Sequence, residues 1–275
     1  MKSLKEVREK VLLEHRKTIA VAAAEDLPVL EAVKEAVTLG IADAVLVGDR
    51  AKIEQYLQQI GGDSDRITIL EAPNQRAAAR AAVSLVREGR AQVLMKGLIG
   101  TADFMRAVLN KEQGLRTGGE ISHVSVIETA SLNRLIVMSD PAMHLYPSLE
   151  EKVKILEGAG QVCRALGVER PRAAVICAVE VVNPSMPPTM DAAVLAKMSD
   201  RGQIGGMLVD GPLALDVALS EKAAAHKGVK GDVAGKADIL LMPGIEAGNI
   251  MWKTLVYMAK TQIAGVIVGP RLPWC

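Results

Sequence analysis

The sequence predicts an α/β protein in which largely parallel sheets are flanked by helices. Short apolar runs rich in β-branched residues recur along the chain, and segments with the apolar spacing of a helix separate them. Most of these runs are apolar throughout and do not alternate with polar residues, which is typical of strands buried on both faces. Ten runs are many for one open sheet in a chain of 275 residues, so we expect two domains.

The predicted helices carry start and stop signals, and the predicted strands lie between them. Ser3 and Ser148 each stand three residues before a glutamate, which makes a capping box that satisfies free amides at a helix start. The helical patterns of residues 28–39 and 213–226 end close to a glycine, a residue favoured just after a helix. The predicted strands are residues 18–23, 44–48, 67–70, 92–97, 123–128, 135–140, 173–180, 207–211, 238–244 and 265–269.

Composition and charge exclude several classes of function. Aromatic residues are 2% of the chain, so we expect an aliphatic core and no base-stacking platform. The 33 basic and 32 acidic residues form no basic block, which argues against nucleic-acid binding. The start of the chain lacks the apolar core of a signal peptide, and no run reaches membrane-spanning length. The three cysteines are far apart with no CxxC, which predicts buried reduced thiols and a cytoplasmic protein.

Unusual residues follow the predicted strand at residues 92–97. In a parallel α/β sheet, ligands gather at the carboxyl ends of strands, where helix starts present free amides. Gly97 lets the backbone approach a ligand, Lys96 adds positive charge, and Thr101 is placed to cap the next helix. Two interpretations stay open: an anion site, or a loop relieved by glycine beside a solvated lysine.

A second candidate is the stretch Asp210-Gly211-Pro212, where an apolar run breaks off at an acid. We expect Asp210 at the strand end and Pro212 near the first turn of the next helix, where proline is favoured. A carboxylate there would orient a ligand. The alternative is that Asp210 and Asp216 only complement the dipole of the following helix.

Two other loops that follow predicted strands contain polar residues. Glu246 and Asn249 lie three apart on one predicted helical face, which indicates a candidate site. The loop of residues 183–189 contains three prolines and ends at Thr189, a candidate helix cap. Simple stiffening of the loop is the alternative interpretation.

Several familiar motifs fail on inspection of the sequence. The segment GMLVDGPL has the glycine spacing of a P-loop, but Pro212 and Leu213 stand where lysine and serine or threonine are required. There is no GxGxxG, no GxSxG elbow, and no metal-ligand spacing among the four histidines. We therefore expect a protein without a metal whose loops suit anionic ligands.

Long stretches of the chain resemble the phosphate acetyl/butyryltransferase family, and its butyryltransferase branch most of all. They include VEVVNPSMPPTMDAAVLAKMSDRGQIGGMLVDGPLALDVALSEKAAAHKG at residues 179–228, LMKGLIGTADFMRAVLNKEQGLRTG at residues 94–118, SHVSVIE at residues 122–128 and ADILLMPGIEAGN at residues 237–249. The resemblance implies an enzyme for acyl-CoA + phosphate ⇌ acyl phosphate + CoA. It also implies a two-domain fold like that of the isocitrate and isopropylmalate dehydrogenases, with a cleft between the domains, and a homo-oligomer.

The chemistry implied by the resemblance needs positioning rather than a cofactor. Phosphate is already a nucleophile and a thiolate leaves a thioester readily, so acyl-CoA and phosphate are substrates, and no metal, nucleic acid or membrane is involved. The resemblance implies that the protein holds two anions and stabilises the oxyanion that forms. The expected site residues are Asp210 and Asn249 as catalytic groups, and Lys96, Gly97, Thr101, Arg116, Gly211 and Pro212 as binding groups for phosphate or CoA.

The sequence also predicts how the chain divides into domains and how its C-terminal end differs from the family pattern. We expect residues 1–118 with 244–275 in the first domain and residues 119–243 in the second. The ending PRLPWC departs from the family pattern, which continues through a Ser-Arg-Ala-Asp segment and a closing helix, so the first domain is expected to be truncated. The alternatives are a phosphate acetyltransferase, or a truncated relative that binds CoA with low or no activity.

Overall fold

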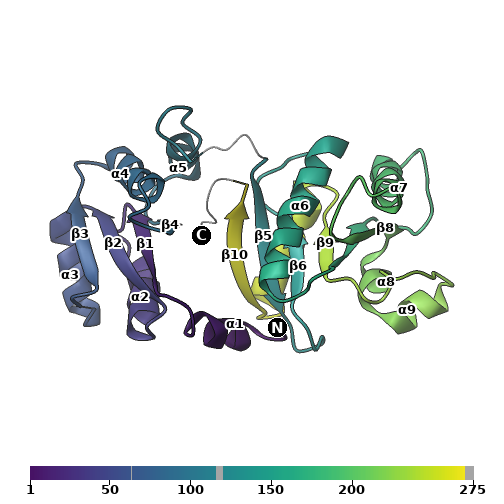
Figure 1. The fold of residues 1–275 in the computed structure, drawn as a ribbon, viewed down its shortest axis with the longest axis horizontal. Helices are drawn as coiled ribbons and strands as arrows, with labels where there is room; N and C mark the ends of the chain where they lie inside the picture. Colours follow the sequence, from purple (N-terminus) through teal and green to yellow (C-terminus); the bar gives the residue numbers. More distant parts are fainter. Residues whose placement is uncertain (63, 116–119, 270–275) are drawn as a thin grey trace. The chain divides into compact units, whose positions relative to one another are not determined.

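The computed structural model describes residues 1–62, 64–115 and 120–269, and within them the chain forms two compact units. Of the described residues, the N-terminal unit contains residues 8–115 and Gly269, and the C-terminal unit contains Met1–Val7 and Glu120–Val268 (Figure 1). Helix α1 (Leu4–Val11) begins in the C-terminal unit and ends in the N-terminal unit. Each unit has a sheet of its own, covered by helices.

The N-terminal unit is built on a four-stranded, fully parallel sheet in the order β3-β2-β1-β4. Val21 of β1, one of the two central strands, packs with the helices α2 and α3 on one face. Its neighbours Ala20 and Ala22 point to the other face, where α4 packs, and are also fully buried. The elements are β1 (Lys17–Ala22), α2 (Leu27–Thr38), β2 (Ala42–Gly48), α3 (Arg50–Ile60), β3 (Ile67–Glu71), α4 (Gln75–Arg87), β4 (Val93–Lys96) and α5 (Thr101–Val108).

The C-terminal unit is built on a six-stranded mixed sheet in the order β10-β5-β6-β9-β7-β8. Strand β5 is antiparallel to both of its neighbours, whereas β6, β9, β7 and β8 are parallel. Separate apolar cores lie on the two faces of this sheet. The strands are β5 (Ser122–Glu128), β6 (Ile136–Ser139), β7 (Arg172–Ile176), β8 (Leu208–Leu213), β9 (Ile239–Leu241) and β10 (Gln262–Val268). The helices are α6 (Leu149–Ala165), α7 (Pro187–Asp200), α8 (Leu215–Leu219), α9 (Glu221–His226), α10 (Ile245–Lys253) and the π-helical turn η1 (Thr254–Met258).

The predicted fold class is confirmed at the level of the elements. Each of the ten predicted strands overlaps a strand in the described residues, and both sheets have helices on their faces. The capping box at α6 forms as predicted: Ser148 Oγ accepts from the Glu151 amide and the Glu151 carboxylate accepts from the Ser148 amide. None of the helices in the described residues combines the length and the apolar character needed to cross a bilayer.

The structure differs from the predicted domain division at its C-terminal end. Residues 244–268 belong to the C-terminal unit, whereas the sequence placed residues 244–275 with the N-terminal domain. Among the described residues of this segment, Gly269 alone falls in the N-terminal unit. Strand β10 pairs antiparallel with β5 along its whole length, from Gln262 opposite Glu128 to Val268 opposite Ser122. The residues of an apolar run do not indicate which strand it pairs with, so the sequence alone could not assign this segment to one of the two domains. Residues 270–275 lie outside the described part of the chain.

Candidate functional sites

The loop that follows β4 is one of the predicted anion sites, and it lies in the N-terminal unit. Lys96 is the last residue of β4, and its Nζ donates to the carbonyl oxygens of Gly97 at 3.2 Å and Ile99 at 3.0 Å. Its charge therefore stays at this loop, with one of three N–H donors left for a ligand. A Cβ atom at Gly97 would lie 2.1 Å from the carbonyl oxygen of Ala23, so glycine is needed here because two backbone segments meet.

Thr101 opens α5 but does not cap it, contrary to the sequence prediction. Gly100 is the N-cap and Thr101 is the first helical residue, so the predicted cap lies one residue too late. The Thr101 side chain is exposed, and its hydroxyl makes no hydrogen bond to the part of the chain that the structure describes. The hydroxyl and the free amides of this helix start are therefore available beside Lys96.

A cationic groove of about 390 Å³ lies between α4 and α5 in the same unit. Arg76, Arg80 and Arg87 of α4 line it together with Arg106 and Asp103 of α5. The α4 arginines recur at helical spacing, which places them on one face of the helix. Four guanidinium groups against one carboxylate give the groove an excess of positive charge.

The ion pairs in this groove leave some of its charge free. Asp103 pairs with both Arg76, at 3.3 Å, and Arg106. Burial alone raises the Asp103 pKa, but the hydrogen bonds and charges of the two arginines outweigh burial and lower it. Arg87 donates to the Glu112 carbonyl at 3.1 Å, and Arg80 has no partner among the described residues. This groove was not among the predicted sites, although the spacing of the arginines along α4 indicates one charged helix face.

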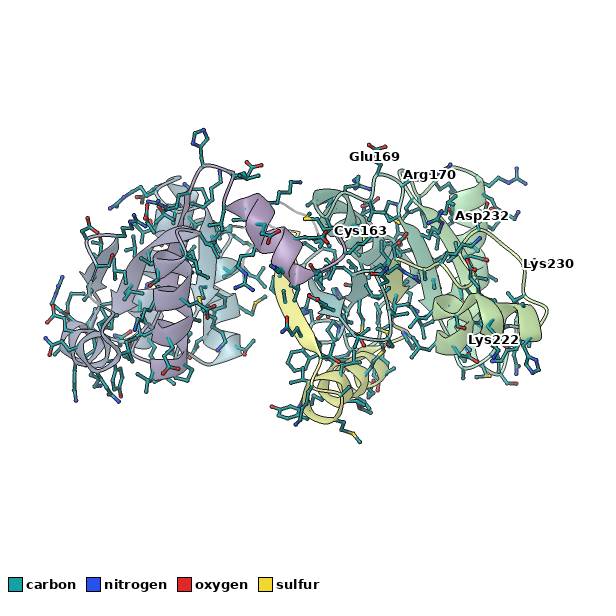
Figure 2. The ribbon with its side chains drawn as sticks, turned by 90° about the horizontal axis from the view of Figure 1, so that it is seen from below. Cys163, Glu169, Arg170, Lys222, Lys230 and Asp232 are labelled. Carbon is teal, nitrogen blue, oxygen red and sulfur yellow. The ribbon has the colours of Figure 1, made fainter. Side chains whose placement is uncertain are left out.

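In the C-terminal unit, Asp210 lies within β8 and not at its end. It is opposite Ala174 of β7, and the strand continues to Leu213. Its Oδ1 accepts from the Gly211 amide at 2.8 Å, and its Oδ2 lies close to Gly231 in the loop after α9. Figure 2 labels Lys230 and Asp232 in that loop. The prediction that the strand stops at Asp210 is therefore wrong.

Gly211 and Pro212 belong to the same strand and do not open a helix. A Cβ atom at Gly211 would lie 2.9 Å from the Cβ of Val175 and 3.2 Å from that of Ala192, so Gly211 lets α7 and β7 pack closely. Pro212 is buried, and α8 begins only at Leu215. A register shift between β7 and β8 accompanies this extension of the strand. The sequence pattern predicts a helix start here because proline is more often found at a helix start than inside a strand.

A lysine that follows α9 pairs with two acidic residues, one in α8 and one in the loop after β7. Lys227 donates to the carboxylates of Asp216 at 3.2 Å and Glu180 at 2.8 Å. The hydrogen bond from Lys227 is the main cause that lowers the Asp216 pKa.

Thr189 does not cap α7, which begins at Pro187. Its buried hydroxyl instead donates within the preceding loop, to the carbonyl oxygens of Asn183 and Met186.

A polar cluster that sequence reasoning missed lies directly after β6. Asp140 is only 3% exposed, and its carboxylate accepts from the backbone amides of His123 at 3.0 Å, Ala142 at 2.7 Å and Met143 at 2.9 Å. It also lies 2.9 Å from His144 Nδ1. Asn249 Nδ2 donates to the Pro141 carbonyl at 3.1 Å, so the predicted catalytic amide ties α10 to this turn.

His144 lies between two carboxylates. Its Nδ1 faces Asp140 and its Nε2 lies 3.0 Å from Glu120 Oε1. The hydrogen bond with Asp140 raises the His144 pKa to about 9; burial opposes this shift and Glu120 adds to it. The imidazole is therefore protonated at neutral pH. An acid at a strand end, followed four residues later by a histidine, was the signal in the sequence.

The buried cysteines agree with the prediction of reduced thiols. Cys163, labelled in Figure 2, lies on α6, and Cys177 follows β7; both are free and buried. Burial raises the pKa of Cys163 to about 12 and that of Cys177 to about 11, so neither thiol is a ready nucleophile. Cys275 lies outside the described residues.

The structure brings only some of the predicted site residues together. Lys96, Gly97 and Thr101 share one loop. Asp210 and Asn249 do not meet. Asp210 lies in β8, whereas Asn249 contacts the turn that follows β6, and the strands β9 and β7 lie between β6 and β8. At the usual spacing between strands, β6 and β8 are roughly 14 Å apart. Arg116 lies outside the described residues.

Comparisons of the sequence identify its relatives. A family model described as Phosphate acetyl/butaryl transferase matches residues 2–79 and 53–274. The chain is 54% identical over 273 residues to the phosphate butyryltransferase of Clostridium acetobutylicum, covering 99% of this chain and 91% of that relative. It is 45% identical over 257 residues to the phosphate acetyltransferase of Thermotoga maritima, covering 94% and 87%.

Solved structures agree with the sequence comparisons. A branched-chain phosphotransacylase from Enterococcus faecalis V583 has a TM-score of 0.84 at 31% identity, covering 94% of this chain and 90% of that one. A 4-hydroxythreonine-4-phosphate dehydrogenase from Klebsiella pneumoniae has a TM-score of 0.55 at 16% identity over 94% of this chain and 89% of that one, a likeness of fold alone. Both likenesses support the fold class predicted from the sequence.

Proposed function

The chain belongs to the phosphate acetyl/butaryl transferase family, and we propose that it catalyses acyl-CoA + phosphate ⇌ acyl phosphate + CoA with butyryl as the preferred acyl group. Butyryltransferases from two Clostridium species share 54% and 52% identity with it, against 45% for the acetyltransferase of Thermotoga maritima. In this reaction a phosphate oxygen attacks the thioester carbonyl carbon, the C–S bond breaks and CoA leaves as a thiolate.

The cationic groove between α4 and α5 is the main support for the proposed location of the anion site. Phosphate and CoA are both polyanions, and arginine binds phosphate through two parallel hydrogen bonds. Arg80 is unpaired among the described residues and is therefore the first group proposed to contact a substrate phosphate. The groove volume of about 390 Å³ is within the range of small-molecule sites.

The loop after β4 supplies the second part of the proposed site. Lys96 and the start of α5 at Thr101 flank one loop in the same unit as the groove, and they supply positive charge and N–H groups for the proposed site. Donors fixed before the reaction stabilise the oxyanion that forms on the carbonyl oxygen without reorganising. Gly97 has a supporting role here, because it permits the close backbone contact that holds Lys96 in place. Arg116 is proposed as a further phosphate contact on the basis of the resemblance.

Asp210 and Asn249 are proposed as positioning residues for the acyl–CoA side. Asp210 binds the amide of Gly211 within β8, and Asn249 ties α10 to the turn after β6. The Asn249 hydrogen bond shapes the turn next to the end of β6, where ligands of α/β sheets bind, and the Asp210 hydrogen bond fixes the backbone inside β8. Gly211 and Pro212 contribute through the close packing of β8 on β7 and α7.

Release of free thiol from butyryl-CoA tests the proposed reaction. We expect release that depends on added phosphate and yields butyryl phosphate in equal amount. Replacing butyryl-CoA with acetyl-CoA should lower kcat/KM by about tenfold or more, because two methylene groups leave an apolar pocket unfilled. Faster turnover of acetyl-CoA would favour the acetyltransferase alternative. Thiol release that does not need phosphate would contradict the proposal altogether.

The cellular context is proposed on separate grounds. The two buried reduced thiols support a cytoplasmic location, and the reaction needs no cofactor beyond the CoA thioester itself. Exposed apolar side chains on α10 and η1 support a homo-oligomer, since Ile250, Tyr257 and Met258 are 66%, 77% and 80% exposed. Light scattering across a range of protein concentrations tests the assembly.

A further inference from the structure

A set of metal-binding atoms lies in the C-terminal unit, which does not contain the arginine groove. Glu120, His144 and Glu151 each offer one ligand atom, and these atoms all lie within 4.8 Å of one another. The three residues come from the segment before β5, the loop after β6 and the first turn of α6. We propose that they bind a divalent transition-metal ion, for which zinc is the probe.

The spacing of the ligand atoms fits such an ion. His144 Nε2 and Glu120 Oε1 lie 3.0 Å apart. Two ligand atoms on a tetrahedral zinc, with bonds of about 2.0–2.1 Å, lie roughly 3.3 Å apart, so a small opening of this pair admits the ion. A carboxylate oxygen of Glu151 is the third ligand atom. Three protein ligands leave one position for water, an arrangement that zinc commonly adopts.

A second observation, independent of the cluster itself, is the orientation of the His144 ring. Its Nδ1 lies 2.9 Å from Asp140 Oδ2, and Asp140 is held by three backbone amides and is 3% exposed. Metal-binding histidines nearly always donate their other ring nitrogen to a carboxylate or a carbonyl, which fixes the tautomer and aims the free nitrogen at the metal. Asp140 holds His144 in this way, with Nε2 directed at Glu120; the metal ion takes the place of the Nε2 proton that otherwise pairs with this carboxylate, and the proton is released to solvent.

The chemistry of the donors indicates which class of ion fits. Two carboxylates neutralise a divalent cation, and an imidazole favours zinc and its neighbours over magnesium or calcium. Glu151 can serve as a ligand without leaving its helix cap, because only its Oε2 accepts from the Ser148 amide. A bound ion would join the loop after β6, the start of α6 and the segment before β5, so its role is to stabilise this unit.

Titration calorimetry of the full chain, first stripped with a chelator, tests the proposal with zinc chloride. We expect one zinc ion per chain. Glu151→Gln preserves the capping box, since glutamine also serves at this helix position, and should weaken zinc binding at least tenfold. Glu120→Gln should weaken it similarly, and His144→Gln should remove it. Matched controls are Glu221→Gln and His226→Gln on α9, which should leave binding unchanged.

X-ray absorption of the zinc complex should show one nitrogen donor from imidazole and two carboxylate donors. Circular dichroism of each variant identifies those that fail to fold; if His144→Gln fails, the two glutamate variants carry the test. Absence of saturable zinc binding by the wild-type chain overturns the proposal. Binding that survives Glu120→Gln and Glu151→Gln, or that falls equally in the α9 controls, overturns it as well.

Discussion

The two units use charge in opposite ways. In the N-terminal unit, arginines project from the surface of α4 and α5 and are only partly neutralised, with Arg80 left without a partner among the described residues. In the C-terminal unit, Asp140 and Lys152 are 3% and 4% exposed and have close partners. Exposed, underpaired charge remains available to a ligand, whereas buried, fully paired charge is already committed to the fold. Substitutions of charged residues in the two units should therefore affect different measurements.

The largest effect is expected from Asp140→Ala. This change leaves three buried amide donors and the His144 ring without their acceptor, so we expect a loss of about 3–5 kcal/mol in the free energy of unfolding of this unit. Urea denaturation measures it. Asp200→Ala is the control, because Asp200 is 63% exposed in its pair with Lys197, and a loss of about 1 kcal/mol or less is expected there. Equal losses in both variants would remove the contrast between buried and exposed charge.

The pH dependence of stability should identify the charge on His144. A folded-state pKa of about 9, above the ordinary 6.5, means that its contribution is fully present below pH 6.5 and is lost as pH rises to about 9. The linkage relation limits this contribution to about 3 kcal/mol. Denaturation in a chelating buffer between pH 6 and 10 measures it, and His144→Gln should flatten the profile. An NMR titration midpoint of the ring near 6.5 would contradict the prediction.

A smaller effect is expected from Gly97→Ala in the N-terminal unit. The added Cβ would lie 2.1 Å from the carbonyl oxygen of Ala23 and 2.8 Å from that of Ala22, so the backbone must shift. We expect a loss of about 2 kcal/mol in stability, together with lower activity because Lys96 moves. Gly100→Ala is the matched control, since its Cβ would meet no atom within 4 Å. If the two alanine variants behave alike, the close backbone contact is not what requires glycine at residue 97.

The smallest effect in free energy is expected from Arg80→Gln, and it should appear in kinetics alone. Removing an exposed, unpaired guanidinium should change stability by less than about 0.5 kcal/mol. The KM for phosphate or CoA should rise about tenfold, which corresponds to about 1.4 kcal/mol. Arg90→Gln, whose arginine pairs with Glu88 and does not line the groove, should leave KM unchanged. An unchanged KM for both substrates in Arg80→Gln would indicate that the anion site lies elsewhere.

Several features of the fold could be predicted because they depend on local pattern. The non-alternating apolar runs placed every strand of the described residues, since a strand covered on both faces must be apolar on both faces. The Ser148 capping box was predictable because its two hydrogen bonds join residues three apart. The loop after β4 could also be located, because Lys96, Gly97 and Thr101 are close in sequence and remain close in the structure.

Sequence alone determined the class of the fold, its strands and the resemblance to acyltransferases, because each of these depends on residue types repeated along the chain. Tertiary structure alone decided that β10 joins β5, that β8 continues through Gly211 and Pro212, and that Asp140, His144 and Glu120 meet. Those outcomes depend on which surfaces pack together in space. Pairing, close approach and the burial of charge are set by partners far away in sequence, and a local pattern carries no record of them.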